Sequence, residues 1–321
     1  RVLTPVDNFG GRLDQIINDR HRLMFRVTWV DSKSDQTWVL GEPDSQTSVI
    51  NFPSRSYVTN YTGSVSPALL FTFAGGYTKF HRTAVDASGN TQGPGYFGFS
   101  VSPATAGITN RRPTATFDIY RAIGAGGIQN QLFESWQTNP MLSWNRGTHT
   151  VKLGADLRRL YAGGQLTGGA PNASIGFTAL QTSLGATGSG NSAASALLGL
   201  ANTFSISRPP ELRMARNVAS LYIQDDWKVN RLLTVNLGIR WDMEGGSADA
   251  LDRVGFFNPE IVHPTVNRTG VFRYAGRDGN PRDITRGDYN NISPRAGFAL
   301  ALGKSRKSVL RGALGVYNGP V

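Results

Sequence analysis

The chain has 321 residues, no cysteine and a formal net charge of +11, from 33 Lys and Arg against 22 Asp and Glu. The lack of cysteine excludes disulfides, Cys-ligated zinc and cysteine nucleophiles. No stretch approaches the roughly 18 consecutive apolar residues of a transmembrane helix. The basic residues are spread along the chain without a basic run, so we expect no nucleic-acid partner.

Five pairs of alternating segments, each pair separated by a short polar or basic break, are predicted to be β-hairpins. In chain order they are residues 9–17 with 22–30, 56–64 with 69–80, 131–144 with 148–161, 217–227 with 232–242, and 293–302 with 309–317. Pro140 predicts a bulge near the turn of the third pair, because proline cannot donate a ladder hydrogen bond. We therefore expect about ten antiparallel strands.

The alternation is clearest in the fourth pair. Its second segment places five apolar side chains on one face and mostly polar ones on the other; the apolar set is Leu233, Val235, Leu237, Ile239 and Trp241. Both segments are about as long as the roughly 9–11 residues that cross a bilayer as a tilted strand. Membrane barrels place aromatic girdles at strand ends, so we predict that Trp29, Trp227 and Trp241 belong to such girdles.

Long polar connections join the hairpins, at residues 31–55, 81–127, 162–214 and 244–292. We expect loops there, apart from a short strand within 114–120 and one short helix over 192–200. All short breaks fall at one end of the predicted strands and all long connections at the other, which is typical of outer-membrane barrels with short periplasmic turns and long extracellular loops. The predicted fold is all-β, an antiparallel up-and-down transmembrane β-barrel.

A soluble β-sandwich also alternates polar and apolar residues, so alternation alone does not show which face meets water. Three features favour the membrane barrel: strands longer than the usual 5–6 or so residues, Trp residues at strand ends, and one-sided loop lengths. A soluble all-β carbohydrate-binding protein stays as an alternative. It requires Val235, Leu237 and Ile239 to be buried between two sheets.

The polar faces of the predicted strands carry charged residues that we expect to face a water-filled lumen. They are Arg26, Asp156, Arg158, Asp226, Arg240, Arg295 and Arg311. Asp226 is expected to pair with a basic neighbour such as Arg240 or Lys228. In barrels of this kind, charges on the lumen side tune selectivity more than stability.

No residue pattern typical of an enzyme or a metal site is found. Asp225 and Asp226 are adjacent in a strand, point to opposite faces and cannot share a catalytic site. The histidines, which are His21, His81, His149 and His263, have no partner at metal-binding spacing. Residues 93–98 fit G-x-G-x-x-G but neither follow an apolar strand nor open a helix. We predict no enzyme, no cofactor and no metal.

Five stretches resemble one protein family. YIQDDWKVNRLLTVNLGIRWD (222–242) is similar to a hairpin that recurs in TonB-dependent outer-membrane receptors of the Oar-like group. Other segments of that family resemble GRLDQIINDRHRLMFRVTW (11–29), WNRGTHTVKLGADLRR (144–159), SAASALLGL (192–200) and NISPRAGFALALGKSRKSVLRGALGVYNG (291–319). The stretches occur in family order and extend over almost the whole chain.

The resemblance implies a bacterial outer-membrane receptor whose barrel of about 22 strands is filled by a plug. We expect residues 1–321 to be part of that barrel, with the plug, the TonB box and an N-terminal regulatory-like domain outside this sequence. The implied partners are outer-membrane lipid and lipopolysaccharide, the protein's own plug, the TonB complex and a ligand that the sequence does not identify. A passive porin or a surface adhesin is the alternative parent, because neither the plug nor the TonB box lies in these residues.

Overall fold

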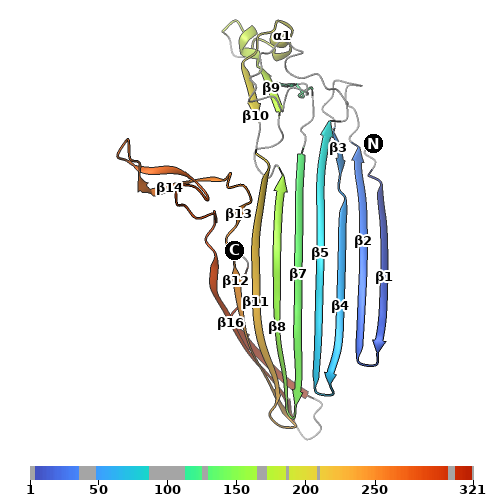
Figure 1. The fold of residues 1–321 in the computed structure, drawn as a ribbon. Coiled ribbons are helices and arrows are strands. Elements are labelled where there is room, and N and C mark those ends of the chain that lie inside the picture. Colours follow the sequence, from blue (N-terminus) through green and yellow to red (C-terminus); the bar gives the residue numbers. More distant parts are fainter. Residues whose placement is uncertain are drawn as a thin grey trace.

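The computed structural model shows one tall, curved antiparallel sheet with smaller elements at one end (Figure 1). The structure describes residues 4–35, 48–86, 113–124, 129–164, 172–185, 188–207, 210–302 and 308–319. Within these ranges, no helix has both the length and the apolar character needed to cross a membrane.

The main sheet has 12 strands in the described residues, and two of them, β3 and β13, are short, which leaves the ten long strands that the sequence predicts. The long strands are β1 (Val6–Asn18), β2 (His21–Asp35), β4 (Ser54–Ser66), β5 (Leu69–Asp86), β7 (Gln129–Arg146), β8 (His149–Gly164), β11 (Leu212–Lys228), β12 (Leu233–Glu244), β16 (Asp288–Leu302) and β17 (Ser308–Gly315). They lie side by side in chain order, and each pairs with its neighbours in antiparallel fashion. The fold is therefore the predicted up-and-down meander.

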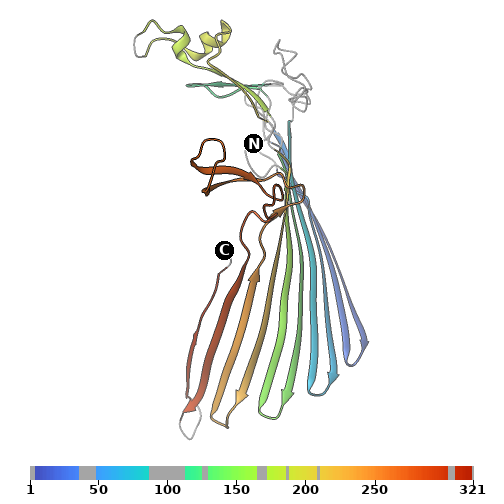
Figure 2. The same ribbon diagram turned by 60° about the vertical axis from the view of Figure 1, so that its left-hand side comes forward.

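The tight turns lie at one end of the sheet, and the chain passes from hairpin to hairpin at the other end (Figure 2). Local sequence accounts for the turns. The Asn18 side chain accepts a hydrogen bond from the Arg20 amide (2.9 Å), and Asn230 Oδ1 accepts from the amides of Leu232 and Leu233 (2.8 and 2.9 Å). Gly147 adopts a φ of +60°, a conformation that glycine enters without steric cost.

The long connections contain more regular structure than the sequence predicts. Short strand β3 (Ser48–Asn51) pairs with β2 and β5, and β13 (Ala248–Asp249) pairs with β11. A hairpin forms from β14 (Gly255–Val262) and β15 (Thr269–Tyr274). Strands β3 and β13 are too short for alternation to reveal them, and both depend on partners distant in sequence.

The described residues between β8 and β11 form a small subdomain with part of the preceding connection. In it, β6 (Thr114–Phe117) pairs in parallel with β9 (Asn172–Phe177), which also pairs with β10 (Thr203–Ser207). The 3-10 helix η3 (Ala179–Thr182) and the helix α1 (Ser192–Leu197) complete it. The predicted strand and helix are both present, and the helix begins where the Asn191 side chain accepts from the amides of Ala193 and Ala194.

The predicted bulge at Pro140 is wrong. The β5 ladder runs through this position without a shift, with Phe73 opposite Pro140. The register to β8 is the same on both sides, since Thr138 faces Leu157 and Met141 faces Gly154. Asn139 and Pro140 have no ladder partners in β8. The missing N–H of proline is therefore accommodated by unpaired positions and not by an extra residue.

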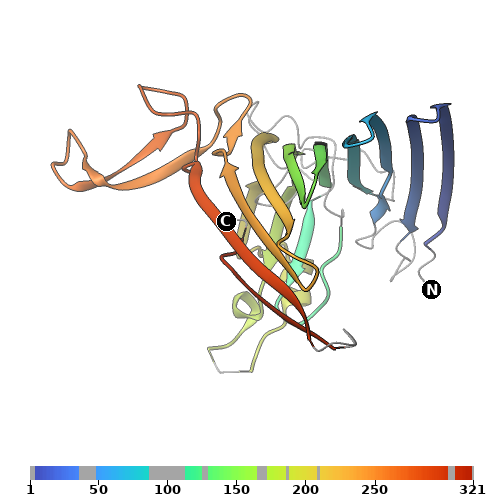
Figure 3. The same ribbon diagram turned by 90° about the horizontal axis from the view of Figure 1, so that it is seen from below.

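No second sheet covers the main one, which forms a single curved layer when seen from below (Figure 3). Leu237 and Ile239 are 47% and 46% exposed. Buried hydrophobic residues in the described part of the chain are confined to Ala84, Ala173, Leu212 and Ala275. A sandwich would bury its apolar side chains between two sheets, so the soluble alternative is excluded.

Candidate functional site

The register divides the main sheet into two faces, because residues paired directly across strands lie on the same face. One row of partners runs across six strands: Val27, Tyr57, Tyr77, Trp136, Arg159 and Asn217. We call the face that carries this row and Leu237 the apolar face, and the opposite one the polar face.

On the polar face, Asp226 pairs with Lys152 of β8, and the expected pairing with Arg240 or Lys228 is wrong. Lys152 Nζ lies 3.1 Å from Asp226 Oδ2, and Asp226 Oδ1 accepts a hydrogen bond from Asn236 (2.6 Å). The register places Asp226 opposite Asn236, which is four residues, or roughly 13 Å, from Arg240 along the strand. The true partner comes from a strand that local sequence does not place next to Asp226.

Arg240 belongs to a second cluster on the same face. It donates to Asp242 Oδ1 (2.8 Å) and to Ser220 Oγ (2.7 Å), and Ser220 donates to Asp242 (2.5 Å). Farther along, Arg216 pairs with Glu244. Ser220 and Glu244 are only 2% and 6% exposed. Charge-assisted hydrogen bonds therefore join β11 and β12 into a rigid polar wall.

All seven charged residues singled out in the sequence lie on the polar face. Arg26, Arg158 and Glu244 belong to the same row of cross-strand partners, which runs from β2 to β12. Arg158 pairs with Asp156 on its own strand (2.5 Å). By contrast, Arg26, Arg295 and Arg311 form no ion pair within the described ranges. Positive charge is thus balanced in the middle of the sheet and left unbalanced toward both edges.

Two of these arginines line a groove of about 620 Å³ that spans β11, β12, β16 and β17. Small residues make the hollow; they are Gly238, Gly297, Ala299 and Ala313. The Arg295 guanidinium lies 4.8 Å from the centre of the Tyr317 ring, and Arg311 lies opposite Ala299 in the register. The groove presents two cations and the polar side chains of Gln224 and Asn236.

The three predicted girdle tryptophans lie on the apolar face. Trp29, Trp227 and Trp241 are 42%, 37% and 42% exposed. Trp227 stacks on His149 at 5.4 Å between ring centres. The indole N–H of Trp241 donates to the Tyr289 carbonyl (2.6 Å). Each thus presents an apolar ring surface, and the Trp241 N–H is satisfied by the protein itself.

His149 and Asp225 form a pair at the end of the sheet with the tight turns. His149 Nδ1 lies 2.6 Å from Asp225 Oδ2, although the two residues are far apart in sequence. Asp225 is on the apolar face and Asp226 on the polar face, so the adjacent carboxylates do not share a site, as predicted. Among the residues that the structure describes, no cluster of three or more His, Cys, Asp or Glu could hold a metal ion.

The sequence matches the family model of the outer membrane beta barrel domain over residues 3–321. The chain belongs to this family. As an outer membrane β-barrel domain it lies in the bacterial outer membrane. In such barrels the short turns lie on the periplasmic side and the long loops on the extracellular side. No curated protein sequence matches the chain significantly.

Solved structures similar to this β-barrel domain include three transporters or receptors. The outer membrane transporter YddB from Escherichia coli is 12% identical, with a TM-score of 0.46 over 93% of this chain and 38% of YddB. The ferric citrate transporter FecA in its unliganded form is 12% identical, with a TM-score of 0.45 over 94% and 34%. The ferric-catecholate import receptor Fiu from E. coli K12 is 10% identical, with a TM-score of 0.38 over 94% and 52%. The chain thus covers between 34% and 52% of these proteins.

Sequence reasoning missed two further exposed tryptophans on the apolar face of the β-barrel. Trp136 lies in the middle of β7 and Trp144 near its turn end; both are on the apolar face and are 55% and 39% exposed. A signal was present, because both occupy even-numbered positions in phase with Leu132 and Leu142. Thr138 and Pro140 interrupt that phase and hide it.

The two tryptophans of the β11–β12 hairpin do not mark the full thickness of the membrane. Trp227 lies opposite Val235, which is six residues, or roughly 20 Å, from Trp241 along the strand. At a strand tilt of roughly 35–45° this is about 15 Å along the barrel axis, less than the apolar band of about 25 Å. Apolar side chains continue on the periplasmic side of Trp227, at Leu233 and Leu310.

On the extracellular side, Asp249 fixes the start of the connection that carries β14 and β15. Its fully buried carboxylate accepts from the Arg253 side chain (2.9 Å) and from the Arg213 amide (2.7 Å). The Arg253 guanidinium, helped by backbone amides, holds the pKa of Asp249 well below its ordinary value. Arg282 adds hydrogen bonds to the carbonyls of Asp249 and Ala250 (3.2 Å each).

The remaining histidines each contact a neighbouring polar group. His21 contacts the Tyr61 hydroxyl (2.7 Å), and His81 contacts Asn130 Oδ1 (2.7 Å). His263 accepts from the Thr265 amide (3.2 Å). The G-x-G-x-x-G match at 93–98 lies outside the described residues.

Proposed function

We propose that the chain is part of the barrel wall of a TonB-dependent outer-membrane receptor that takes up a scarce ligand. The observation that carries the proposal is the set of five stretches that resemble the Oar-like group in family order. Four of the five form strands of the one barrel sheet, and the stretch at residues 192–200 contains α1 on the extracellular side.

The family-like residues are concentrated where the polar wall is built. In the stretch at 222–242, Asp226 and Arg240 anchor the two hydrogen-bonded clusters. In the stretch at 144–159, Gly154 lies under the Tyr222 ring, which leaves no room for a Cβ.

We further propose that residues 1–321 are one portion of the barrel domain and that the polar face lines the lumen. The partners would be the protein's own plug, the TonB complex, outer-membrane lipid and lipopolysaccharide, and a ligand that is not identified. We propose no catalytic role, because the polar face places its carboxylates in ion pairs with basic residues and not beside a nucleophile.

Binding to TonB tests the proposal without knowledge of the ligand. The full-length protein, purified from outer membranes in mild detergent, is passed over the immobilised periplasmic C-terminal domain of TonB. We expect specific retention, which is lost when soluble TonB domain is added as competitor.

No retention, together with steady ion conductance of the full-length protein in planar bilayers, would show a passive porin. No retention and no conductance would point to an adhesin. Either result would overturn the proposed function.

A further inference from the structure

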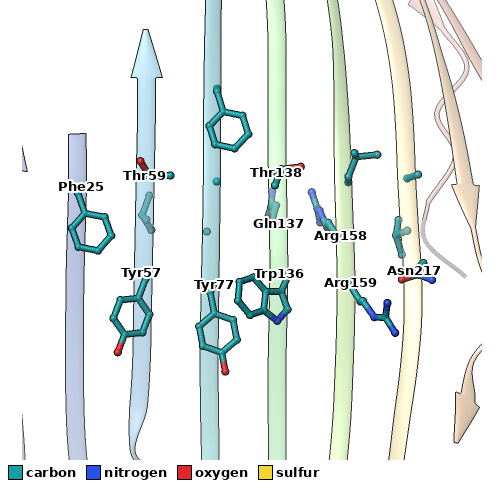
Figure 4. A pocket seen from close by; sticks show the side chains of 17 residues that line it. Phe25, Tyr57, Thr59, Tyr77, Trp136, Gln137, Thr138, Arg158, Arg159 and Asn217 are labelled. Carbon is teal, nitrogen blue, oxygen red and sulfur yellow. The ribbon is translucent and has the colours of Figure 1, made fainter. Parts of the chain in front are cut away.

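The apolar face carries a groove in the middle of the sheet, away from both edges. It has a volume of about 580 Å³ and crosses β2, β4, β5, β7, β8 and β11 (Figure 4). The hollow arises because one row of partners has small side chains: Thr59, Gly75 and Thr138 lie next to one another in the register. Phe25 and Leu157 lie at the two ends of this row.

A row of aromatic rings borders the groove on its extracellular side. Tyr57 and Tyr77 stack with ring centres 6.2 Å apart, and Tyr77 and Trp136 are 4.4 Å apart. The Tyr77 hydroxyl donates to Glu134 (2.8 Å), which also lies 3.6 Å from Lys79. Aromatic rings with polar tips are typical of the boundary between hydrocarbon and headgroups.

Arg159 ends this aromatic row and points away from the lumen. It lies between Trp136 and Asn217 in the register, and Figure 4 shows its side chain extending from β8 toward β11, where Asn217 lies. Its guanidinium lies 5.1 Å from the centre of the Tyr161 ring. No acidic side chain pairs with Arg159 in the described part of the chain, whereas its neighbour Arg158, on the polar face, pairs with Asp156.

The position of Arg159 along the strand identifies the leaflet. Arg159 is ten residues beyond His149, the first residue of β8 at the periplasmic turn, which is roughly 33 Å along the strand. At a tilt of roughly 35–45° this places it about 25 Å from that turn, at the far boundary of the apolar band. An unpaired arginine on the lipid face is costly at the midplane and nearly free at the interface. Arg159 therefore lies among the headgroups of the extracellular leaflet.

We propose that this groove is a binding site for lipopolysaccharide, with a lipid A phosphate on Arg159 and an acyl chain along the groove. Guanidinium groups bind phosphate oxygens through paired N–H donors. Asn217 offers an amide donor beside it, and Phe25, Thr138 and Leu157 offer the apolar surface that an acyl chain requires. Lipid A is the phosphate-bearing lipid of the extracellular leaflet. The site needs the outer-membrane location but not TonB-dependent uptake, so the two proposals can fail separately.

The test uses the full-length protein, stripped of lipid in detergent and titrated with bisphosphorylated lipid A under native mass spectrometry. We expect Arg159→Gln to weaken binding about tenfold, the equivalent of about 1.4 kcal/mol, and Arg159→Lys to restore part of it. Arg26→Gln is the matched control, because it removes the same charge from the opposite face at a residue that does not line the groove. Heat-modifiable mobility in electrophoresis shows that each variant is folded.

Two further titrations define the ligand. Lipid A without phosphates should bind the wild type and Arg159→Gln equally weakly, and Trp136→Ala should weaken both lipid A forms by removing a wall of the groove. Equal lipid A binding by Arg159→Gln and the wild type would overturn the proposal. Phosphatidylglycerol that binds as tightly as lipid A, with the same dependence on Arg159, would replace lipopolysaccharide by a general anionic phospholipid.

Discussion

An arginine introduced at Ile223 should destabilise the barrel far more than an arginine at the next residue, Gln224. Ile223 is 46% exposed on the apolar face of β11, with Leu153 and Ile239 beside it in the register. It lies four residues from Trp227, or roughly 13 Å along the strand, and about 10 Å along the barrel axis at a tilt of roughly 35–45°.

At this depth an arginine on the lipid face costs roughly 2–4 kcal/mol, a change of about 30-fold to 1,000-fold in the folding equilibrium. Gln224 lies on the polar face and donates to Asp226 (3.1 Å), a contact that an arginine can also make. Gln224 is half-buried on the polar face, where charged substitutions change selectivity more than stability, so we expect a change of about 0.5 kcal/mol or less. The difference between the two variants thus measures whether lipid covers the apolar face.

The assay is urea unfolding of the full-length protein reconstituted in liposomes, followed by tryptophan fluorescence and electrophoretic mobility. Ile223→Arg should lower the unfolding midpoint strongly, and Gln224→Arg should leave it near that of the wild type. Equal midpoints for the two variants would refute the assignment of the faces.

Two further changes test specific contacts. A Cβ at Gly154 would lie 2.4 Å from atoms of the Tyr222 ring, so Gly154→Val should cost roughly 1–3 kcal/mol by overpacking; the Tyr222→Ala background should remove most of that cost in the same unfolding assay. The Arg253 side chain is the main cause of the lowered pKa of Asp249. The ionised carboxylate therefore stabilises the connection at 245–287 fully when the pH is above the ordinary pKa of aspartate. This stabilisation is lost as the pH falls through the lowered pKa of Asp249. The protection factor of the Arg253 amide against hydrogen exchange should therefore fall only in strong acid, and in Asp249→Asn it should be low already at neutral pH; a well-protected amide in the variant would contradict this.

Alternation along the strands was enough to predict the architecture. Residues 233–241 alone assign two faces, and the same alternation repeated in five hairpins predicts both the strand order and the end at which the tight turns lie. It also places residues as distant as Arg26 and Arg311 on one face. This information is local, because a strand with period 2 determines its faces without knowledge of its neighbours.

Contacts between strands could not be predicted in the same way. The partner of Asp226 depends on the register of β8 against β11, which no local pattern determines, so Lys152 was missed and Arg240 was wrongly expected. The pairing of His149 with Asp225 was missed for the same reason. Arg159 was not singled out, although the alternation that places Arg158 on the polar face puts the next residue on the opposite face.

Most of the short strands in the long connections were not predicted, for a different reason. Strands such as β9 and β10 have few residues, so alternation has too little length to be recognised, and they form because they pair with each other. The three-residue break at 145–147, by contrast, was found directly because Gly147 must adopt a positive φ there.

The most direct test of the central claim is the environment of successive residues along β12. The chain has no cysteine, so single cysteines at residues 235 to 240 of the full-length protein can be spin-labelled without background in liposomes. Electron paramagnetic resonance then measures how often each label collides with oxygen dissolved in the lipid. We expect frequent collisions for labels at 235, 237 and 239, and few for labels at 236, 238 and 240. Equal accessibility at all six positions, or collision of the odd-numbered labels with a water-soluble nickel complex, would contradict a barrel wall with its apolar face in the membrane.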